Sequence, residues 1–430
     1  MHRIGIRRED KSRWERRVPL TPSHVGDLVT GEGIDVAVQA SPIRVYPDGD
    51  YEKAGASIVE TLDGCGVVMG VKEVPASIIH AGRAYVCFSH TIKGQEENMP
   101  LLQSVLDYDA TLIDYELIVD EAGRRLVFFG RHAGVAGMVD SLWSLGRRLK
   151  AEGVASPFDQ IEPTHRYADM AAARSAVSRL GESIGTDGLP EALLPFVCGI
   201  TGYGNVSRGA QEVFDLLPVV EISATDLDSL DPDPHRCYKV VFKEEDIVTH
   251  VEEGMTFDLR EYYEAAHNYR GTFPRYAPYL TMLINCIYWD ARYPKLLKRE
   301  DFAALYASPN PRLKVVGDIT CDINGSLECT THATTPDDPT YIFDVDRGAA
   351  IEGVTGRGPL VLAVDFLPCE LPRDASLAFG DALTPLVPSL AKADLTGELA
   401  ASGLPQSLQM ATIAHRGSLM PRFEYLSAHL

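Results

Sequence analysis

The sequence predicts an α/β fold in which helices cover mainly parallel sheets and the chain divides into two domains. Three observations lead to this prediction. Short apolar runs alternate with helical patterns along the first third of the chain, as they do where crossover helices join parallel strands. A glycine-rich turn at residues 199–209 separates an apolar run from a segment with helical apolar spacing. The 430 residues also exceed the usual size of one core.

The first third contains five short apolar runs that we expect to be strands, at residues 3–6, 34–38, 66–71, 84–88 and 111–116. Between the first two runs, residues 23–30 form a helix in this prediction. Thr21 is a favourable N-cap for it, and Pro22 suits the first helical position.

A second unit begins near Gly134. Residues 133–150 predict a long helix rich in small side chains, and a second helix runs from about residue 167 to 180. After the glycine turn, the segment from Pro372 is expected to be helical in part. Further strands are expected at residues 219–221, 239–242, 313–316 and 359–364, with a polar loop at residues 330–340.

The glycine turn resembles a dinucleotide-binding pattern. Gly202 and Gly204 have the spacing of the first two glycines in GxGxxG, where backbone amides approach a pyrophosphate at a helix N-terminus. The third position is Ser207, and Gly209 follows two residues later. Glu221 ends a short strand nineteen residues after Gly202, where an acidic residue would bind the adenosine ribose. The alternative is an ordinary strand-to-helix turn.

Charge and cysteine usage restrict the partners and the compartment. With 61 acidic and 40 basic residues the net charge is −21, so we expect neither nucleic acid nor an anionic membrane as a partner. The eight cysteines are scattered without a CxxC pair, which predicts reduced thiols, no zinc site and a cytoplasmic protein. The first residues lack an apolar signal core, and no apolar run approaches the length of a membrane span.

Polar side chains follow three of the predicted strands. Lys72, His90 and Glu116 each come at the carboxyl end of a strand, where open α/β sheets bind their ligands. A lysine and a histidine in one site can divide acid and base roles, because burial and positive neighbours lower a lysine pKa and histidine titrates near neutrality. The alternative is that Lys72 is a solvated strand end and His90 a capping or core residue.

Two basic clusters stand out in this acidic chain. They could bind substrate carboxylates through bidentate pairs, or they could form ion pairs within a domain. Their members are Arg13, Arg16 and Arg17 in the first cluster, and Arg124, Arg125 and Arg131 in the second.

Seven stretches together resemble lysine–2-oxoglutarate reductase, within the wider group of saccharopine dehydrogenase and alanine dehydrogenase. They are residues 7–22, 71–75, 88–95, 202–207, 285–289, 317–322 and 367–373, and their order and spacing are hard to obtain by chance. The resemblance implies two Rossmann-type domains, as in alanine-dehydrogenase-like enzymes, with an interdomain cleft. Residues 1–133 and 369–430 would form the substrate and catalytic domain, and residues 134–368 the dinucleotide-binding domain.

The resemblance also implies a reaction in which L-lysine condenses with 2-oxoglutarate and the imine is reduced to saccharopine. Lys72 and His90 would be the acid–base pair, and Arg17 and Gln95 would bind substrate. Glu116 and Phe129 are further candidates for the substrate site. The expected nucleotide-binding residues are Arg124, Gly202, Gly204, Asn205, Val206, Glu221, and the turn Asp318, Ile319, Thr320 and Cys321 at the nicotinamide side.

The cofactor and the amine donor leave alternatives. The resemblance favours NADPH, whereas the charge of Glu221 would oppose a 2′-phosphate and favour NADH. A related amino-acid or opine-type dehydrogenase with another amine donor is one alternative function. A nucleotide-binding regulator without turnover is another, against which the presence of Lys72, His90, Arg17 and Gln95 argues. The oligomeric state stays open.

Overall fold

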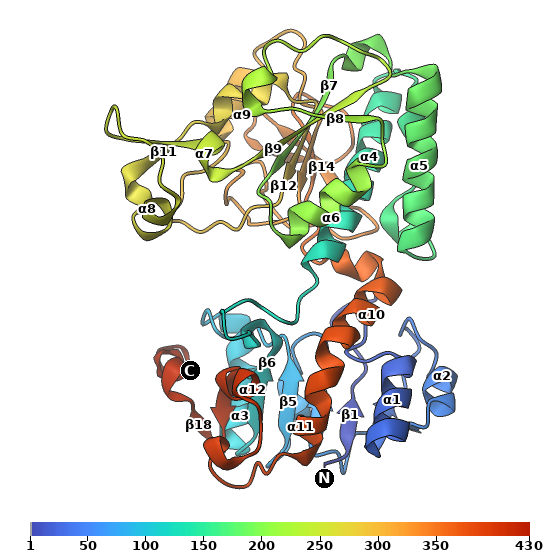
Figure 1. Ribbon diagram of the computed structural model, residues 1–430, viewed down its shortest axis with the longest axis vertical. Helices are drawn as coiled ribbons and strands as arrows, with labels where there is room; N and C mark the ends of the chain where they lie inside the picture. Colours follow the sequence, from blue (N-terminus) through green and yellow to red (C-terminus); the bar gives the residue numbers. More distant parts are fainter. Residues whose placement is uncertain (1) are drawn as a thin grey trace. The chain divides into compact units, whose positions relative to one another are not determined.

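The computed structural model describes residues 2–430, which form two compact units (Figure 1). The first unit runs to Phe129 and resumes at Pro372, and the second comprises Gly130–Leu371. The sequence analysis placed the two boundaries between the units after residues 133 and 368. Each unit contains one eight-stranded sheet with helices around it, so the α/β prediction is confirmed.

The sheet of the first unit is mainly parallel. Its strand order is β18-β17-β6-β5-β4-β1-β2-β3, and only β17 and β18 run antiparallel to their neighbours. These strands are β1 (Ile4–Ile6), β2 (Val36–Gln39), β3 (Ser57–Val59), β4 (Val67–Met69), β5 (Ala84–Cys87), β6 (Thr111–Asp114), β17 (Thr412–His415) and β18 (Ser418–Leu419). The helices of this unit are α1 (Pro22–Glu32), α2 (Asp48–Lys53), α3 (Met99–Asp107), α10 (Pro372–Leu383), α11 (Val387–Lys392) and α12 (Gln406–Met410).

The second unit has its own sheet, with the order β15-β14-β16-β13-β12-β7-β9-β8. Only β14 and β15 are antiparallel in it. The strands are β7 (Phe196–Thr201), β8 (Val219–Glu221), β9 (Cys237–Phe242), β12 (Met282–Asn285), β13 (Val315–Asp318), β14 (Thr340–Asp344), β15 (Ala349–Ile351) and β16 (Leu360–Leu362). A separate hairpin joins β10 (Val248–His250) to β11 (Tyr269–Gly271). The helices are α4 (Gly130–Ala151), α5 (Met170–Asp187), α6 (Asn205–Phe214), α7 (Glu244–Ile247), α8 (Leu259–Glu264) and α9 (Arg299–Leu305).

The sequence did not predict the antiparallel strands at the two sheet edges. β17 and β18 lie in the segment expected to be partly helical, and β14 and β15 follow the polar loop. These strands hydrogen-bond to neighbours far away in the chain, so a local apolar pattern carries little information about them.

Two glycines allow α4 and α6 to pack unusually closely (Figure 1). A methyl group on Gly134 would lie 1.9 Å from the carbonyl oxygen of Val206, and one on Gly209 would lie 2.0 Å from that of Arg131. The third glycine of the dinucleotide pattern normally allows the helix that follows the turn to pack closely against its neighbours. In this chain Gly209 supplies close packing against α4, which explains its shifted position after Ser207.

Among residues 2–430, no helix combines the length and the apolar character needed to cross a membrane.

We expect Gly134→Ala to lower the free energy of unfolding by about 1–3 kcal/mol, because α4 and α6 must move apart to admit the methyl group. Gly185→Ala is the matched control on the exposed surface of α5, where a methyl group meets nothing within 4 Å. The control should be neutral or more stable by up to about 1 kcal/mol. Thermal unfolding of both variants measures the difference. An unchanged melting temperature for Gly134→Ala would contradict the close packing.

Candidate active site and nucleotide site

The first candidate site lies at the carboxyl ends of neighbouring parallel strands in the first unit. β1 pairs with β4, β4 with β5, and β5 with β6, all in parallel. The loops after these four strands carry Glu9, Lys72, His90 and Glu116, respectively. Parallel pairing therefore gathers the predicted acid–base residues at one edge of the sheet.

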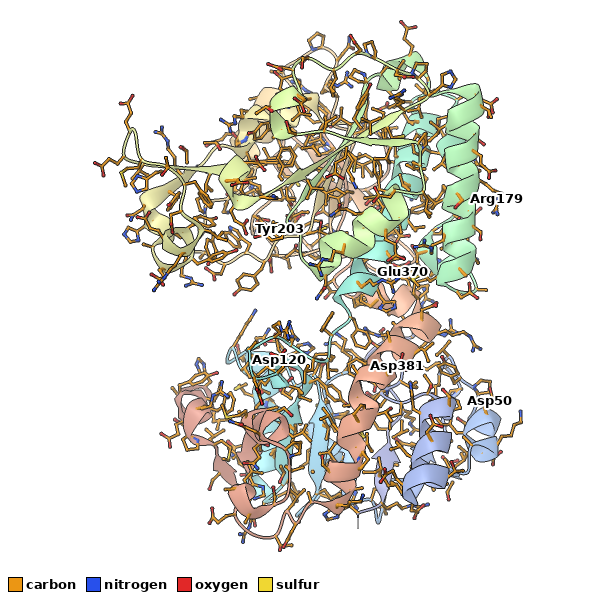
Figure 2. The ribbon with its side chains drawn as sticks, in the orientation of Figure 1. Asp50, Asp120, Arg179, Tyr203, Glu370 and Asp381 are labelled. Carbon is orange, nitrogen blue, oxygen red and sulfur yellow. The ribbon has the colours of Figure 1, made fainter. Side chains whose placement is uncertain are left out.

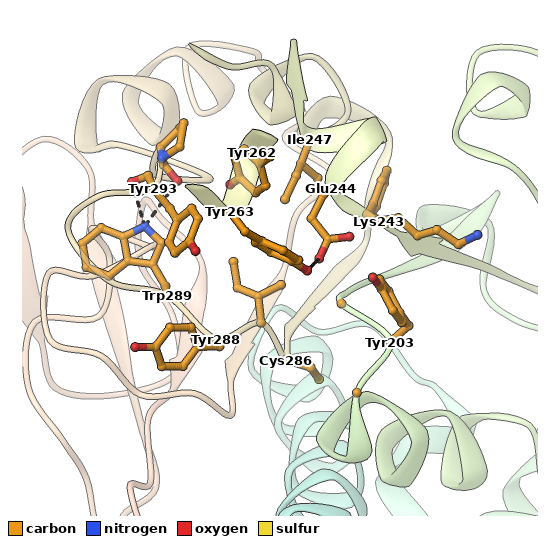
Figure 3. A pocket seen from close by; sticks show the side chains of 15 residues that line it. Tyr203, Lys243, Glu244, Ile247, Tyr262, Tyr263, Cys286, Tyr288, Trp289 and Tyr293 are labelled. Atoms are coloured by element: carbon orange, nitrogen blue, oxygen red, sulfur yellow. Dashed lines mark hydrogen bonds between the residues drawn. The ribbon is translucent and has the colours of Figure 1, made fainter. Parts of the chain in front are cut away.

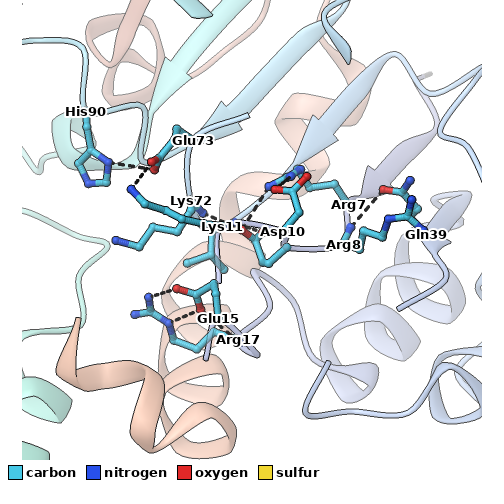
Figure 4. Close-up of polar contacts among 12 residues, drawn as sticks. Arg7, Arg8, Asp10, Lys11, Glu15, Arg17, Gln39, Lys72, Glu73 and His90 are labelled. Carbon is cyan, nitrogen blue, oxygen red and sulfur yellow. Dashed lines mark hydrogen bonds and ion pairs between the residues drawn. The ribbon is translucent and has the colours of Figure 1, made fainter. Parts of the chain in front are cut away.

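Lys72 is half-buried and is surrounded by charged side chains. Its backbone N–H donates to Glu9 Oε2 at 3.1 Å, and its side chain extends between the Glu73–His90 pair and the Glu15–Arg17 pair (Figure 4). Burial lowers the pKa of Lys72, the positive charge of Arg17 lowers it further, and the Glu15 carboxylate acts in the opposite direction. A lysine with a lowered pKa exchanges a proton more readily near neutral pH.

Glu73 orients the imidazole of His90. Its Oε2 lies 3.2 Å from His90 Nδ1, and its Oε1 forms an ion pair with Lys11. Burial alone would raise the pKa of Glu73, but the hydrogen bonds from His90 and Lys11 outweigh it and lower the pKa to about 2. A carboxylate held on Nδ1 sets the tautomer of the ring and directs Nε2 to proton exchange with a ligand.

A buried network that the sequence analysis missed positions the His90 loop. Asp114 is fully buried at the end of β6 and accepts hydrogen bonds from the Ser89 N–H at 3.0 Å and from the Ser89 hydroxyl. Its other oxygen accepts from the Glu116 N–H at 2.7 Å. His90 itself has φ 51°, which an unsupported L-residue rarely adopts. An Asp that ends an apolar strand was the available sequence signal for this network.

Arg17 is buried in a bidentate ion pair with Glu15. Nε lies 2.7 Å from Glu15 Oε1, and Nη2 lies 2.5 Å from Oε2. The guanidinium carbon also lies 4.3 Å from the ring centroid of Phe129, a cation–π distance. The ion pair corresponds to the alternative interpretation of this basic cluster, and substrate binding by Arg17 remains a prediction.

Phe129 and Gln95 lie in the same unit. The Phe129 ring stacks on Phe379 with centroids 4.5 Å apart, and Phe88 packs 6.0 Å from Phe129. Gln95 immediately precedes the short 3-10 turn Glu96–Asn98, in the loop that follows His90. Phe129 is thus close to the first candidate site through its contacts with Arg17 and Phe88, and Gln95 is close to it in sequence. The contact of either residue with substrate remains a prediction.

Glu116 and Arg124 form ion pairs in the loop between β6 and α4. Glu116 Oε1 lies 3.6 Å from Arg125 Nη1, and Arg124 Nε lies 2.8 Å from Asp120 Oδ2. Asp120 marks this loop in Figure 2. The Arg124 side chain is 81% exposed, so the structure shows a surface ion pair at this position. The predicted nucleotide contact of Arg124 is untested.

The glycine turn of the second unit has the geometry of an anion-binding site. β7 ends at Thr201, Gly202 has φ 83°, and α6 begins at Asn205. A methyl group on Gly202 would lie 3.1 Å from Ile287, whereas the space beside Gly204 is open. Backbone N–H groups at the start of α6, including that of Val206, are thus accessible to a pyrophosphate.

Glu221 does not lie where the sequence spacing placed it. It ends β8 at the edge of the sheet, and β9 separates that strand from β7. Its carboxylate forms a 3.0 Å ion pair with Lys239 of β9. An acidic residue that binds ribose follows the strand adjacent to the glycine turn. In this sheet that position belongs to Lys243 and Glu244, after β9.

The turn from Asp318 to Cys321 is held by buried hydrogen bonds. Asp318 accepts from Asn285 Nδ2 at 2.8 Å, from Thr330 Oγ1 at 2.5 Å and from the Cys321 N–H at 3.2 Å. Burial raises the pKa of Asp318 to about 6.

The turn also docks onto the loop after β12. Thr320 Oγ1 donates to the Ile287 carbonyl at 2.8 Å, and Cys321 has φ 56°. Ile319, which lies between Asp318 and Thr320 in the chain, is buried. The turn is therefore rigid, and its predicted place beside a nicotinamide is untested.

Comparison with known proteins shows which proteins the chain resembles. Residues 5–136 match the family "Alanine dehydrogenase/PNT, N-terminal domain". Over 98% of its length the chain is 39% identical to alpha-aminoadipic semialdehyde synthase of Arabidopsis thaliana and 36% identical to the mitochondrial enzyme of that name from Bos taurus. It is 27% identical to the NAD(+), L-lysine-forming saccharopine dehydrogenase of Neurospora crassa, with 88% of each chain covered. Over nearly its whole length the chain is therefore similar to proteins of the saccharopine dehydrogenase and alanine dehydrogenase group.

The chain matches only part of the two synthases, and its fold matches solved structures. The chain spans 41% and 47% of the two semialdehyde synthases, which is less than half of each relative. An L-alanine dehydrogenase structure covers 99% of the chain with a TM-score of 0.64 at 19% identity, and a transhydrogenase from Sinorhizobium meliloti covers 97% with 0.56 at 15%. The chain therefore shares the fold of these two structures.

We expect Glu73→Gln to lower the melting temperature at pH 7 and to lose this effect in acid. Because the folded pKa of Glu73 lies near 2, below its ordinary 4.5, the carboxylate stabilises the fold above pH 4.5 and loses that contribution as pH falls toward 2. Thermal unfolding from about pH 7 to about pH 3 should therefore show a difference in melting temperature between the wild type and Glu73→Gln that narrows below about pH 5. Glu97→Gln, at an exposed position in the 3-10 turn after β5, is the control. A difference in melting temperature that does not change with pH would contradict the assigned contacts.

Proposed function

We propose that this protein condenses L-lysine with 2-oxoglutarate and reduces the product to saccharopine with a nicotinamide dinucleotide, NADPH or NADH. The observation that carries the proposal is the placement of Lys72, with its lowered pKa, beside the Glu73–His90 pair at the ends of adjacent strands. The substrate class is inferred from two similar proteins, a semialdehyde synthase and a lysine-forming saccharopine dehydrogenase.

The reaction needs two proton transfers around a carbon–nitrogen bond. The ε-amine of lysine attacks the keto carbon of 2-oxoglutarate, and Lys72 carries one proton from the attacking nitrogen to the carbonyl oxygen. His90 then protonates the resulting hydroxyl, water leaves, and the iminium carbon accepts a hydride to give the secondary amine. Two groups in different electrostatic environments can divide these roles. The bound dinucleotide supplies the hydride.

The substrate's carboxylates require cations in an otherwise acidic protein. We assign one of them to Arg17, whose guanidinium is oriented by Glu15 and by the Phe129 ring. Gln95 and Glu116 flank the same strand ends and are assigned to the polar groups of the substrate. A bidentate guanidinium matches the geometry of a carboxylate.

The dinucleotide is assigned to the second unit. Gly202, Gly204, Asn205 and Val206 hold its pyrophosphate, a role that the left-handed φ of Gly202, the open space at Gly204 and the N-terminus of α6 support. The turn from Asp318 to Cys321 is assigned to the nicotinamide end, and Arg124 to the nucleotide phosphates.

One experiment separates this function from its alternatives. Oxidation of NADPH or NADH is followed at 2-oxoglutarate saturation with L-lysine and, in parallel, with other amino acids as amine donors. Turnover that requires lysine supports the proposal, and saccharopine identified as the product completes it. Turnover with another amine identifies a related dehydrogenase, and nucleotide binding without turnover identifies a regulator.

We expect Lys72→Met to lower kcat by roughly 10²-fold or more, the usual contribution of a positioned acid–base group. The dissociation constant of the nucleotide should stay close to the wild-type value, because Lys72 lies in the first unit and the glycine turn in the second. Steady-state kinetics and a nucleotide titration measure the two quantities. A wild-type kcat in this variant would refute the acid–base assignment.

We expect Arg17→Gln to raise the KM for 2-oxoglutarate by about tenfold or more, since one side of a desolvated charge pair is lost. Arg16→Gln is the matched control, because the neighbouring Arg16 is exposed and its Nε donates to the Ile43 carbonyl. Nucleotide affinity should be unchanged in both variants. A variant that loses thermal stability but keeps a wild-type KM would show that Arg17 serves only the fold.

A further inference from the structure

An aromatic pocket adjoins the glycine turn of the second unit (Figure 3). It encloses about 370 Å³, a size typical of small-molecule sites. The walls come from the loops after β7, β9 and β12 and from α8, and its lining includes Gly202, Tyr203, Glu244, Tyr263, Tyr288 and Trp289. Seven aromatic side chains line this largely apolar space, which suits a flat heterocycle such as adenine.

The strand order explains why this pocket lies where an adenosine would bind. In the common dinucleotide-binding sheet, the strand that follows the glycine turn in sequence also lies beside the first strand. Here the next strand in sequence, β8, is at the edge, and β9 takes the place beside β7. The loop that leaves β9 therefore occupies the position of the ribose-binding loop.

Glu244 is the acidic residue of that loop. It is half-buried, it begins α7, and its Oε1 accepts a hydrogen bond from the Tyr263 hydroxyl at 2.7 Å. The carboxylate faces the interior of the pocket near Tyr203, whereas Lys243, which also lines the pocket, directs its ammonium group away from Glu244 (Figure 3). Burial and the neighbouring Glu244 raise the pKa of Tyr263, so its hydroxyl stays protonated and remains a donor to this carboxylate.

We propose that Glu244, and not Glu221, accepts hydrogen bonds from the ribose hydroxyls of the adenosine and makes this protein prefer NADH to NADPH. The aromatic walls hold the adenine ring next to it. The proposal rests on the proposed function only in that a nicotinamide dinucleotide binds the second unit.

Charge is the physical basis of this discrimination. A ribose 2′-hydroxyl can donate to a carboxylate, and a hydrogen bond to a charged acceptor is stronger than a neutral one. A 2′-phosphate carries up to two negative charges and has no proton to donate at neutral pH. Placed against a partly desolvated carboxylate, it meets repulsion that water screens poorly.

The position of Glu221 gives the proposal a built-in control. Its side chain is 66% exposed and is paired with Lys239 at the far side of β9, outside the pocket lining. The proposal therefore predicts different effects on the NADH-to-NADPH affinity ratio for substitutions at the two glutamates. Glu221→Gln removes the same charge as Glu244→Gln but leaves the pocket unchanged.

Binding is measured by titration calorimetry with NADH, NADPH, 5′-AMP and adenosine 2′,5′-bisphosphate, which need no turnover. The wild type should bind NADH more tightly than NADPH. Glu244→Gln, which keeps the acceptor for Tyr263, should reduce the NADH-to-NADPH affinity ratio by about tenfold or more, and Glu244→Ser should do the same. The two adenosine nucleotides should follow the same trend, because they carry only the adenosine end. Glu221→Gln should leave every ratio unchanged.

Three results would overturn the proposal: tighter NADPH binding by the wild type, an unchanged ratio in both Glu244 variants that circular dichroism shows to be folded, or a shifted ratio in Glu221→Gln. Failure of the proposed function has a different signature. Lysine and 2-oxoglutarate would then give no turnover, while the nucleotide ratios would still depend on Glu244.

Discussion

Parallel pairing of β1, β4, β5 and β6 is the constraint on which the first candidate site depends. Each loop that leaves these strands emerges at the same edge, so residues far apart in sequence meet there, as Glu9 and Lys72 do. The strands themselves are buried and mainly apolar, and the buried carboxyl of Asp114 stands at the very end of β6. Polar chemistry is therefore displaced to the strand ends, which the hydrogen-bond register aligns.

The charges at that edge are arranged in opposing pairs. Arg7 with Glu9 and Arg17 with Glu15 are buried ion pairs, and Glu73 joins Lys11 and His90. Burying single charges would be costly, and pairing reduces that cost. Burial lowers the pKa of Lys72 in their midst, while Glu9 fixes its backbone. The pairs hold the loops in place, whereas burial is the main cause of the lowered pKa of Lys72.

The second unit shows how a binding pattern survives changes in its details. The third glycine of the pattern is replaced by Ser207, and Gly209 and Gly134 provide the close packing between α4 and α6 instead. The strand beside β7 is β9, and β8, the next strand in sequence, lies at the edge. Sequence spacing alone does not reveal this strand order, on which the position of a residue relative to the glycine turn depends.

Local sequence was sufficient for the elements whose pattern is short-range. Alternating apolar runs and helical segments identified the α/β class, the central strands, the long helix α4 and the turn at Gly202, because apolar periodicity and glycine conformation act within a few residues. It also placed Lys72 and His90 at one edge of the sheet, since polar residues that follow parallel strands share that edge. Only the tertiary structure decided the antiparallel edge strands, the pairing of Arg17 with Glu15, the support of His90 by Asp114, and the exchange of β8 and β9. Each of these depends on hydrogen bonds or charges between segments whose partners no local pattern names, and strand order, which sets those partners, is settled only when the sheet assembles.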